Sequence, residues 1–435
     1  MNKKFKNQIN IGLVGFGTIG SGVAKFLMER RSLLLKRTGI GFNLSLVCDK
    51  DLSSKRDVNI PKKMLTRDFN RVINDPDIHI VVELVGGIHP AKEIVMKALS
   101  KGKHVVTANK LLLAAEGGEI FQKAKDSNRE IYFEASVGGG IPIIKAIREG
   151  MVGNRFSGIF GILNGTSNYI LSSMSSQGSS FKAALKEAQS KGYAEKDPSL
   201  DIKGLDSSHK LAILSLLAFG KKVDINDIFV EGIEDISNLD IQYAKELGYV
   251  VKLLAIAKRY GNELEVRVHP TLLPSEYLLS SVSGAYNAIF IEADLVEKQL
   301  FYGQGAGKLP TASAVLSDIV DIGHKIACGK NSAKSVIPEN TEIRKLRKMD
   351  DVVTRYYAHF SAIDKPGVLA NIADLLGRHN ISIASVVQKE RREAHIVPIV
   401  MLTHEAKESD MQAALRKINK LSAIKKKSVV IRLEK

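Results

Sequence analysis

Tryptophan is absent from this 435-residue sequence, and cysteine occurs only twice, as Cys48 and Cys328. A disulfide-stabilised secreted scaffold is therefore excluded, because such scaffolds depend on several closely spaced cysteines. The two thiols and the histidines also lack the short spacings that are typical of zinc ligands. We expect reduced thiols and a cytoplasmic protein.

Long hydrophobic runs are missing as well. A membrane-spanning helix needs roughly 20 consecutive apolar residues, and the longest candidate, Leu211–Phe219, is much shorter. The basic, polar segment Met1–Asn10 has no apolar core of the kind found in secretory signal peptides. The sequence thus predicts neither membrane insertion nor secretion.

The charge is strongly positive, with 63 Lys and Arg residues against 47 Asp and Glu residues and a formal net charge of +16. These basic residues are spread along the chain, and the densest run, Lys425–Lys427, has no interleaved aromatic residues. We therefore expect no nucleic-acid partner, but a solvated basic surface that attracts small anionic ligands.

The first 135 residues alternate short β-branched runs with amphipathic helical segments. Alternation of this kind predicts an α/β domain over residues 1–135, with a doubly wound parallel sheet and right-handed crossovers. The expected strands are Ile11–Gly15, Leu44–Cys48, Ile78–Val85, His104–Thr107 and Glu130–Ala135, and the clearest helices are Ser21–Arg37 and Pro90–Lys101.

The pattern changes at Ser136, where turns rich in Gly, Ser and Asn and longer helical segments begin. We expect a second, α+β domain over residues 136–340, through which the chain dimerises. Its expected helices are Phe181–Lys191, Ser207–Gly220 and Ile241–Tyr260, and its expected strands are Phe156–Leu163 and Leu264–Leu273.

A charged stretch, Glu339–Asp351, has the composition of a linker and precedes a third expected domain, residues 352–435. The pattern there predicts the order βαββαβ, which is typical of a ferredoxin-like fold. The expected elements are the strand Tyr356–Ile363, the helix Leu369–His379, the strands Ile383–Glu390 and Ala394–Thr403, the helix Glu408–Asn419 and the strand Lys427–Leu433.

A glycine-rich turn directly follows the first expected strand, and it consists of Gly15, Phe16, Gly17, Thr18, Ile19 and Gly20. In a GxGxxG turn the glycines permit a tight bend, close approach of a pyrophosphate and close packing of the helix on the strand. The strand–turn–helix context predicts a Rossmann-type NAD(P) site, with the phosphates at the helix N-terminus.

Asp49 directly follows the second expected strand, at the place where an acidic residue binds the adenosine ribose hydroxyls in NAD-dependent domains. Its neighbour Lys50 could instead pair with the 2′-phosphate of NADP. Because Asp49 could equally be a solvated residue at a strand end, the choice between NAD and NADP stays open.

Charged residues concentrate between Lys191 and Lys210, in the sequence KGYAEKDPSLDIKGLDSSHK. Asp206 and Lys210 are four residues apart and would share one face of a helix. Carboxylates suit a substrate ammonium group, and a lysine suits a carbonyl or hydroxyl oxygen. Lys110, which follows the strand His104–Thr107, could point into the ligand crevice of the sheet. The plainer interpretation is a solvated strand end for Lys110 and a surface ion pair for Asp206 and Lys210.

Five sequence blocks together resemble homoserine dehydrogenases, over about residues 10 to 340: GFGTIGSG (Gly15–Gly22), TANK (Thr107–Lys110), EASVGGGIP (Glu134–Pro142), NGTSN (Asn164–Asn168) and the block Ala188–Lys210. Residues 356–433 resemble an ACT domain, both in element order and in the segment Asp364–Leu369 (DKPGVL).

This resemblance implies reversible hydride transfer between NAD(P)H and L-aspartate 4-semialdehyde, which gives L-homoserine in threonine, methionine and isoleucine biosynthesis. It makes Lys210 the proton donor and Lys110 a partner that lines the cofactor and the substrate. Glu195 would bind the substrate ammonium group, with Asp206 in support.

The resemblance also implies further ligand contacts. Thr107 and Gly303 would line the cofactor, and the helix Ala312–Ile326 would return to the first domain. A sodium site would be formed by Glu134, Val137, Gly139 and Ile141. Relatives often carry alanine where this chain has Gly139, but the ligand there is a backbone carbonyl.

For the ACT-like segment the resemblance implies inhibition by L-threonine, bound between paired copies near the Pro366–Gly367 turn. A passive oligomerisation module is the alternative. We expect a homodimer or a homotetramer.

Two other functions compete with a homoserine dehydrogenase. The chain could be an amino-acid-sensing ACT protein with a non-catalytic Rossmann domain. It could also be a semialdehyde dehydrogenase that works through a cysteine thioester, although neither Cys48 nor Cys328 is well placed for that chemistry.

Overall fold

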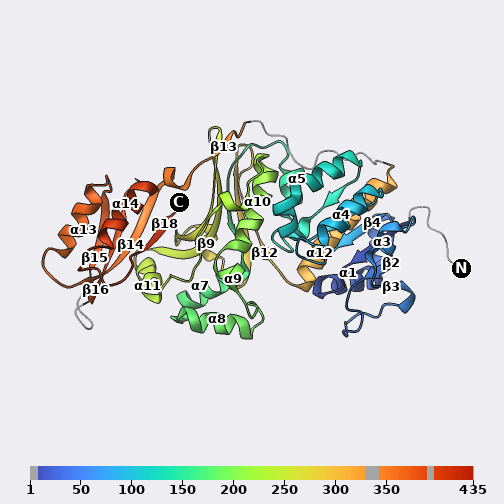
Figure 1. The fold of residues 1–435 in the computed structure, drawn as a ribbon, viewed down its shortest axis with the longest axis horizontal. Helices are drawn as coiled ribbons and strands as arrows, with labels where there is room; N and C mark the ends of the chain where they lie inside the picture. The colour runs from blue at the N-terminus through green and yellow to red at the C-terminus, as the bar shows by residue number, and fades with distance from the viewer. Residues whose placement is uncertain (1–7, 330–341, 389–395, 435) are drawn as a thin grey trace. The chain divides into compact units, whose positions relative to one another are not determined.

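The computed structural model describes residues 8–329, 342–388 and 396–434. The chain divides into two compact units, whose course can be followed in Figure 1. Unit 1 comprises Met1–Phe156, His209–Asp227 and Ala293–Thr341, and unit 2 comprises Ser157–Ser208, Ile228–Glu292 and Glu342–Lys435. The three domain ranges expected from the sequence stay a prediction. The ends of the expected strands at Glu390 and Ala394, and the start of the expected linker at Glu339, lie outside the described residues.

Unit 1 is built around a six-stranded sheet with the order β3-β2-β1-β4-β5-β6, in which neighbouring strands are parallel. The order reverses between β1 and β4, so a ligand crevice is expected at the carboxyl ends of these two strands. The predicted doubly wound sheet is thereby confirmed. Its strands are β1 (Gln8–Val14), β2 (Gly41–Cys48), β3 (Leu65–Thr66), β4 (Ile80–Glu83), β5 (His104–Thr107) and β6 (Ile131–Tyr132).

Two helices replace the single helix that was predicted over Ser21–Arg37. α1 (Thr18–Glu29) ends at Arg30, whose φ of −99° and ψ of 14° leave the helical region, and α2 (Arg31–Thr38) follows. The apolar periodicity comes from α1, because α2 has no buried residue. The other elements of unit 1 are α3 (Phe69–Asn74), α4 (Ala91–Ser100), α5 (Lys110–Asp126), α6 (Ile143–Lys145) and β12 (Glu297–Gln304).

A late helix, α12 (Lys308–Ala327), packs against the sheet of unit 1. Val315, Ile319 and Ile322 belong to the same buried core as the side chains of β1 and β4. The contact is close, since a Cβ on Gly323 would lie 2.5 Å from the ring of Phe42. Residues far along the chain thus complete the core of the N-terminal fold.

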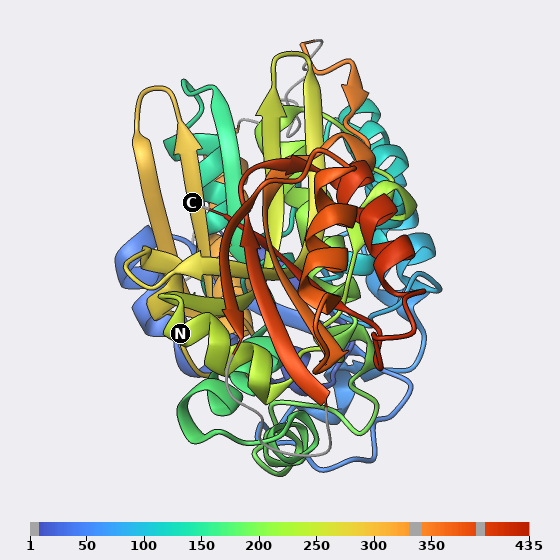
Figure 2. The same cartoon turned by 90° about the vertical axis from the view of Figure 1, so that its left-hand side faces the viewer.

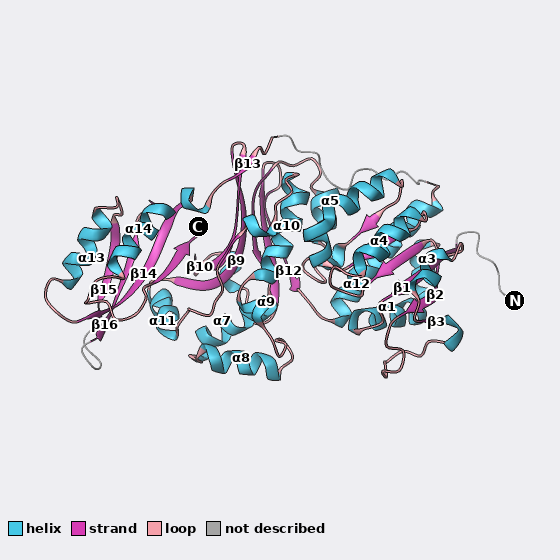
Figure 3. Ribbon diagram, viewed as in Figure 1, coloured by secondary structure: helices cyan, strands magenta, loops and turns pink. Residues whose placement is uncertain are grey.

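Unit 2 contains a long mixed sheet, in which β11, β7, β9, β10, β18, β14, β16 and β15 are neighbours in that order. Its strands are β7 (Phe156–Ile162), β9 (Tyr249–Tyr260), β10 (Glu263–Pro274), β11 (Tyr286–Ala293), β14 (Val353–Ile363), β15 (Ile383–Gln388), β16 (Ile396–Thr403) and β18 (Val429–Leu433). The short strands β8 (Phe229–Val230) and β13 (Lys345–Leu346) pair with β10, and β17 (Ala406–Lys407) pairs with β14. Figure 3 draws strands in magenta and helices in cyan.

The helix predicted over Ile241–Tyr260 is wrong for most of its length. The structure has α11 (Asn238–Glu246) and then the strand β9, separated by Gly248 with a φ of +84°. A left-handed glycine ends a helix, and the β-branched Val250 and Val251 that follow favour a strand. β9 pairs along its whole length with the antiparallel β10.

Between β7 and α11 the chain forms the helices α7 (Gly165–Gln177), α8 (Phe181–Ser190), α9 (Ser199–Ile202) and α10 (Leu205–Phe219). The two expected helices in this region are therefore confirmed. α10 begins at Leu205, so that Asp206 and Lys210 belong to one continuous helix.

The C-terminal part of unit 2, Val353–Leu433, has the predicted order of strands and helices. α13 (Val368–Gly377) and α14 (Glu408–Ile418) lie side by side on one face of its strands, as the orange and red helices of Figure 2 show. Tyr356, Ala358 and Phe360 of β14 point into the core beneath these helices. The chain's last strand, β18, lies between β14 and β10, so the sheet is continuous from one part of unit 2 to the other.

Within the described ranges, every helix is too short or too polar to cross a membrane.

Candidate functional site

The glycine-rich turn has the geometry of a dinucleotide-binding turn. Gly15 has a φ of +101°, and a Cβ there would lie 2.4 Å from the backbone of Leu84. A Cβ on Gly20 would lie 1.9 Å from the carbonyl oxygen of Gly15, which is why the helix can pack so closely on the strand. Around Gly17, at the N-cap of α1, no heavy atom of the described residues lies within 4 Å of an added Cβ. The turn is therefore filled on two sides and open where a pyrophosphate would approach.

A cavity of about 750 Å³ opens at this turn, at the carboxyl ends of β1 and β4. Of the residues expected to bind a cofactor, it brings together Gly15, Gly17, Asp49 and Lys50. Phe16 is buried within the turn, and Thr18 and Ile19 begin α1. Sequence reasoning missed other lining residues, above all Arg67 and His89. Arg67 directly follows β3, which is too short to show a periodicity.

The side chain of Asp49 connects the end of β2 to the glycine-rich turn by a hydrogen bond. One of its carboxylate oxygens accepts a hydrogen bond from the N–H of Phe16, and the other accepts one from the N–H of Asp51 at 2.8 Å. The N–H of Gly15 donates to the carbonyl of Cys48 at 2.8 Å. Each carboxylate oxygen keeps a lone pair for a ribose hydroxyl. Lys50 and Arg67, both exposed, add two positive charges at the same end of the cavity.

A buried carboxylate underlies the end of β5. Glu83, which is fully buried at the end of β4, accepts hydrogen bonds from the hydroxyl of Thr107 at 2.7 Å and from the N–H of Val85 at 2.8 Å. Burial raises the pKa of Glu83. Sequence reasoning missed Glu83, although an acidic residue at the end of an apolar strand is a signal that could have found it.

Asn109 continues this network to the start of α5. Its N–H donates to the hydroxyl of Thr107 at 3.0 Å, and its side-chain oxygen accepts from the N–H of Leu112 at 3.1 Å as an N-cap. Its amide group also donates to the carbonyl of Gly87 at 2.6 Å. Lys110 is the first residue of α5, so its backbone position is fixed by these hydrogen bonds.

Lys210 lies in α10 and is buried. α10 packs against α5 around a small apolar cavity that is lined by Leu113, Ala114, Ala212 and Leu216, among others. The two helices that carry Lys110 and Lys210 therefore lie side by side in unit 1.

In unit 2, Asn164 brings two carboxylates together. Its side-chain oxygen accepts from the N–H of Ser167 at 2.8 Å and so caps α7. Its amide nitrogen donates to Asp201 at 2.6 Å and to Asp206 at 2.9 Å. Asp206 is buried, in the first turn of α10. Sequence reasoning placed Asn164 in a block that resembles the family without giving it a role, although Asn before an apolar helix is a typical N-cap.

Glu195 is exposed and lies in the loop between α8 and α9. The side chain of Gln189 donates to its carbonyl at 3.2 Å, and the hydroxyl of Thr166 donates to the carbonyl of Tyr193 at 2.6 Å. The backbone of this loop is thus attached to α8 and to the start of α7, while the carboxylate of Glu195 faces solvent.

The expected cation ligands lie in one turn of unit 1. The carboxylate of Glu134 accepts hydrogen bonds from the N–H groups of Ile144 and Lys145, each at 2.8 Å. The N–H of Glu134 donates to Asp318 at 2.9 Å. Burial raises the pKa of Glu134, and burial together with the Glu134 charge raises that of Asp318 well above its ordinary value. Among the residues that the structure describes, no group of three or more His, Cys, Asp and Glu side chains could hold a metal ion.

Gly303 approaches this same turn. Gly139 has a φ of +56°, and a Cβ there would lie 2.6 Å from the backbone of Gly305. The N–H of Gly140 donates to the carbonyl of Gln304 at 3.1 Å, and a Cβ on Gly303 would lie 3.2 Å from Ile141. The residues from Val137 to Ile141 are therefore held against the chain around Gly303, and glycine fits position 139 better than alanine.

The two cysteines do not suit a thioester mechanism. Cys48 is buried, and burial together with the charge of Asp49 raises its pKa to about 11, so it is a neutral thiol near pH 7. Cys328 is exposed just after α12.

Family models match three consecutive parts of the chain. The NAD-binding domain of homoserine dehydrogenase matches residues 15–134, homoserine dehydrogenase matches residues 142–320, and the ACT domain matches residues 359–423.

Whole proteins are similar over nearly the full length. A homoserine dehydrogenase of Neisseria gonorrhoeae is 43% identical over 429 residues, which are 98% of this chain and 98% of the relative. One of Synechocystis is 43% identical over 98% of this chain and 99% of the relative. A crystal structure of a homoserine dehydrogenase from Thiobacillus denitrificans has a TM-score of 0.91 and 43% identity, and the match covers 98% of each chain. A hyperthermophilic archaeal homoserine dehydrogenase in complex with NADPH has a TM-score of 0.63 and 28% identity, over 73% of this chain and 98% of that one.

Proposed function

Because the chain belongs to the homoserine dehydrogenase family, we propose that it catalyses the reversible reduction of L-aspartate 4-semialdehyde to L-homoserine with NAD(P)H. The observation that carries this proposal is the identity of 43% over 98% of the chain with a curated homoserine dehydrogenase. The cavity at the glycine-rich turn supports it, because it offers a dinucleotide a pyrophosphate site and a ribose carboxylate.

The nicotinamide group, when bound, supplies or accepts the hydride. Its pyrophosphate would lie on the turn of Gly15, Phe16, Gly17, Thr18, Ile19 and Gly20, with Thr107 and Gly303 farther along the cofactor. Asp49 would accept hydrogen bonds from a ribose, which suits NAD. Lys50 and Arg67 would bind a 2′-phosphate, which suits NADP. We therefore propose that the enzyme accepts both cofactors.

For the chemical step we propose Lys210 as the proton donor to the aldehyde oxygen, since an ammonium group stabilises negative charge that develops there. Lys110 would assist at the same oxygen. Asp206 lies one turn before Lys210 on α10 and would support the binding of the substrate ammonium group. Glu195, on its exposed loop, would bind that ammonium group directly.

A sodium ion is proposed at the turn of Glu134, Val137, Gly139 and Ile141. The donors fit a hard cation, because they are a carboxylate and backbone carbonyls, and each Glu134 oxygen keeps a lone pair after accepting one N–H. Such an ion would hold this turn against the chain around Gly303. It would raise the melting temperature in sodium relative to choline at equal ionic strength, and an equal melting temperature in both salts would contradict it.

We further propose that L-threonine regulates the enzyme through the ACT domain, and that the chain forms a homodimer or a homotetramer. The turn before α13 supports this, because Gly367 has a φ of +85° at the N-cap and no side chain of the described residues caps the helix, whose N-terminus favours a carboxylate. If threonine leaves the activity of the intact enzyme unchanged, this part of the proposal is wrong.

The test of the main proposal is an initial-rate assay of NAD(P)H absorbance with L-homoserine, run with both cofactors. Oxidation of homoserine at a rate of at least about 1 per second is the expected result. If the purified chain binds NAD(P)H but turns over no homoserine with either cofactor, the non-catalytic sensor is the better interpretation.

A further inference from the structure

Glu83 places a buried carboxylate at the end of an apolar strand. β4 consists of the apolar residues 80–82 and Glu83, and all of them are fully buried. Burial of a carboxylate costs free energy, and an apolar residue at this position would avoid that cost. The proposed reaction gives Glu83 no role, but its hydrogen bonds reach the wall of the cofactor cavity and indicate one.

Both oxygens of this carboxylate accept hydrogen bonds. One accepts from the N–H of Val85, in the loop after β4, at 2.8 Å. The other accepts from the hydroxyl of Thr107 at 2.7 Å, and Thr107 is the residue of β5 that pairs with Glu83. A proton on either oxygen would face a donor, so this geometry suits the ionised carboxylate. Glu83 thus connects the loop after β4 to the end of β5.

The loop after β4, residues 84–87, is held by further hydrogen bonds. The N–H of Leu84 donates to the carbonyl of Val14 in β1 at 2.7 Å. At the other end of the loop, the side chain of Asn109 donates to the carbonyl of Gly87 at 2.6 Å. Two residues of the loop are glycines with φ of +75° and +69°, a conformation that other residues rarely adopt. The loop is therefore fixed to β1, to Glu83 and to the N-cap of α5.

This loop forms part of the wall of the cofactor cavity, which is lined by Leu84, Val85 and Gly86 among others. Asp49 follows β2 on one side of β1, and the strand order places β4 on the other side of β1. A dinucleotide whose adenosine ribose is bound by Asp49, and whose pyrophosphate lies at the turn after β1, would extend its nicotinamide half towards β4 and β5. The loop after β4 is therefore on the nicotinamide side of the cavity.

We propose that Glu83 is a positioning residue for the nicotinamide half of the cofactor. Its carboxylate holds the loop 84–87 and the end of β5 in one arrangement, and it acts through this loop. The hydroxyl of Thr107 also accepts from the N–H of Asn109 at 3.0 Å, so the same hydrogen bonds reach the start of α5, where Lys110 lies. The inference rests on the proposed function only in that the ligand is a nicotinamide dinucleotide.

The test compares two ligands on the full-length protein by titration calorimetry. NADH carries both halves of the cofactor, whereas ADP carries the adenosine and the pyrophosphate but no nicotinamide. Glu83→Gln keeps the shape of the side chain, but it has only one acceptor oxygen for the two donors. We expect this variant to bind NADH about tenfold more weakly than the wild type, and to bind ADP with an affinity within about twofold of the wild type.

Glu130→Gln is the matched control. Glu130 is also buried, and it directly precedes β6, at the opposite end of the same sheet, where it pairs with Lys325 at 2.7 Å. This variant should bind both ligands like the wild type. If Glu83→Gln does not fold, Thr107→Ser and Thr107→Val replace it in the test, because only serine keeps the hydroxyl that donates to Glu83. We then expect NADH to bind about tenfold more tightly to the serine variant.

A role of Glu83 in general stability would affect the two ligands alike. The proposal is therefore wrong if Glu83→Gln weakens ADP as much as NADH, or if it weakens neither. It is also wrong if Thr107→Ser and Thr107→Val, used in its place, bind NADH equally well. A wild-type protein that binds NADH but does not oxidise homoserine contradicts the proposed function alone, because this test measures binding. A wild-type protein that does not bind NADH contradicts both.

Discussion

The amide nitrogen of Asn164 lies 2.9 Å from a carboxylate oxygen of Asp206 and donates a hydrogen bond to it. The same nitrogen donates to Asp201 at 2.6 Å, so one neutral side chain orients two carboxylates. Since Asp206 is proposed to support the binding of the substrate ammonium group, Asn164 becomes a positioning residue for the substrate.

Replacing Asn164 by aspartate keeps the shape but removes the donor. Three carboxylates would then meet, and the carboxylate of Asp206 would turn away or bind a proton. We expect kcat/KM for homoserine to fall by about 10- to 100-fold, mainly through KM, because a hydrogen bond to a charged group contributes about 1.5–3 kcal/mol. The dissociation constant of NAD(P)H, measured by fluorescence, should not change. A fall in kcat alone would contradict a role in substrate positioning.

The proposed proton donor is tested by Lys210→Ala. Turnover should fall by orders of magnitude, since the assisting ammonium group of Lys110 does not replace the proton donor at the aldehyde oxygen, while NAD(P)H still binds. Lys182→Ala, at an exposed position of α8, is the matched control and should keep full activity. Retained turnover in Lys210→Ala would assign the proton donor to another residue.

Alanine at two positions of the glycine-rich turn should affect different properties, the stability at Gly20 and the cofactor affinity at Gly17. Gly20→Ala should lower the melting temperature, because its Cβ would lie 1.9 Å from the carbonyl oxygen of Gly15. Gly17→Ala should leave the melting temperature of the cofactor-free protein nearly unchanged and weaken NAD(P)H binding by about tenfold, because the added methyl group occupies the approach of the pyrophosphate. If both variants behave alike, the cofactor does not approach at Gly17.

Lys252 makes the stability depend on pH. This lysine of β9 is buried, and its ammonium group donates to the side chain of Asn168 at 3.3 Å and to the carbonyl of Val282. Burial lowers its pKa to about 8. In the unfolded chain a lysine titrates near pH 10.4, so between about pH 8 and pH 10.4 the unfolded state binds more protons. This group therefore makes the free energy of unfolding rise with pH in that window.

Lys252→Met should remove the rise of the free energy of unfolding with pH. We expect the urea midpoint of the variant, relative to that of the wild type, to fall progressively as the pH increases from 8 to 10. Lys186→Met, on an exposed face of α8, should show no such trend. If the urea midpoints of Lys252→Met and the wild type differ by the same amount at pH 8, 9 and 10, Lys252 is charged in the folded protein throughout this range.

Much of the fold could be predicted because its signals are local. The alternation of strands and helices, the glycine-rich turn and the βαββαβ order all follow from short segments, and the structure confirms this architecture. The failure at Ile241–Tyr260 has a physical reason. β9 is buried on both faces over much of its length, so it shows a continuous apolar run instead of an alternation, and such a run can also be a buried helix.

The site was less predictable than the fold. Lys110, Lys210, Glu195 and Asp206 stood out by residue type and by resemblance, and their roles stay predictions. Asn109, Asn164 and Glu83 were missed because their importance lies in hydrogen bonds to residues far along the chain, such as Asp206, which follows Asn164 by 42 residues. Sequence patterns reveal periodicity. A single amide side chain that donates hydrogen bonds to two carboxylates leaves no periodic pattern, so the sequence does not reveal it.

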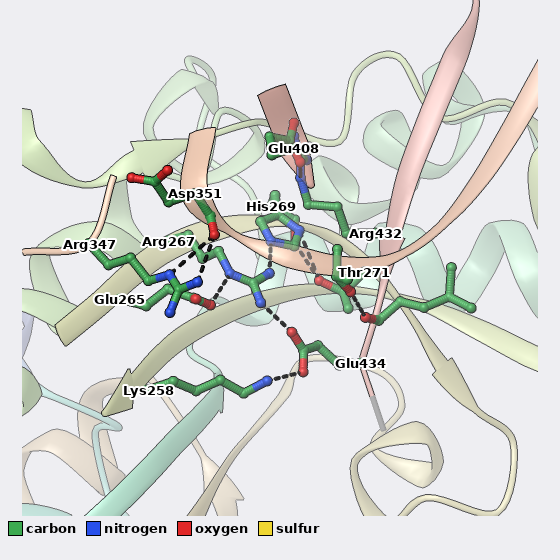
Figure 4. A network of polar contacts seen from close by, with 12 residues as sticks. Lys258, Glu265, Arg267, His269, Thr271, Arg347, Asp351, Glu408, Arg432 and Glu434 are labelled. Atoms are coloured by element: carbon green, nitrogen blue, oxygen red, sulfur yellow. Dashed lines mark hydrogen bonds and ion pairs between the residues drawn. The ribbon is translucent and has the colours of Figure 1, made fainter. Parts of the chain in front are cut away.

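The position of β18 has a consequence for how the protein is made. This strand follows the other described strands in the sequence, and it lies inside the sheet, between β10 and β14, rather than at an edge. Until β18 has been translated, the edges of β10 and β14 that it pairs with stay unpaired, and Arg267 lacks its ion pair with Glu434 (Figure 4). Chains that lack β18 would keep these edges open, and they would be prone to aggregation and to proteolysis.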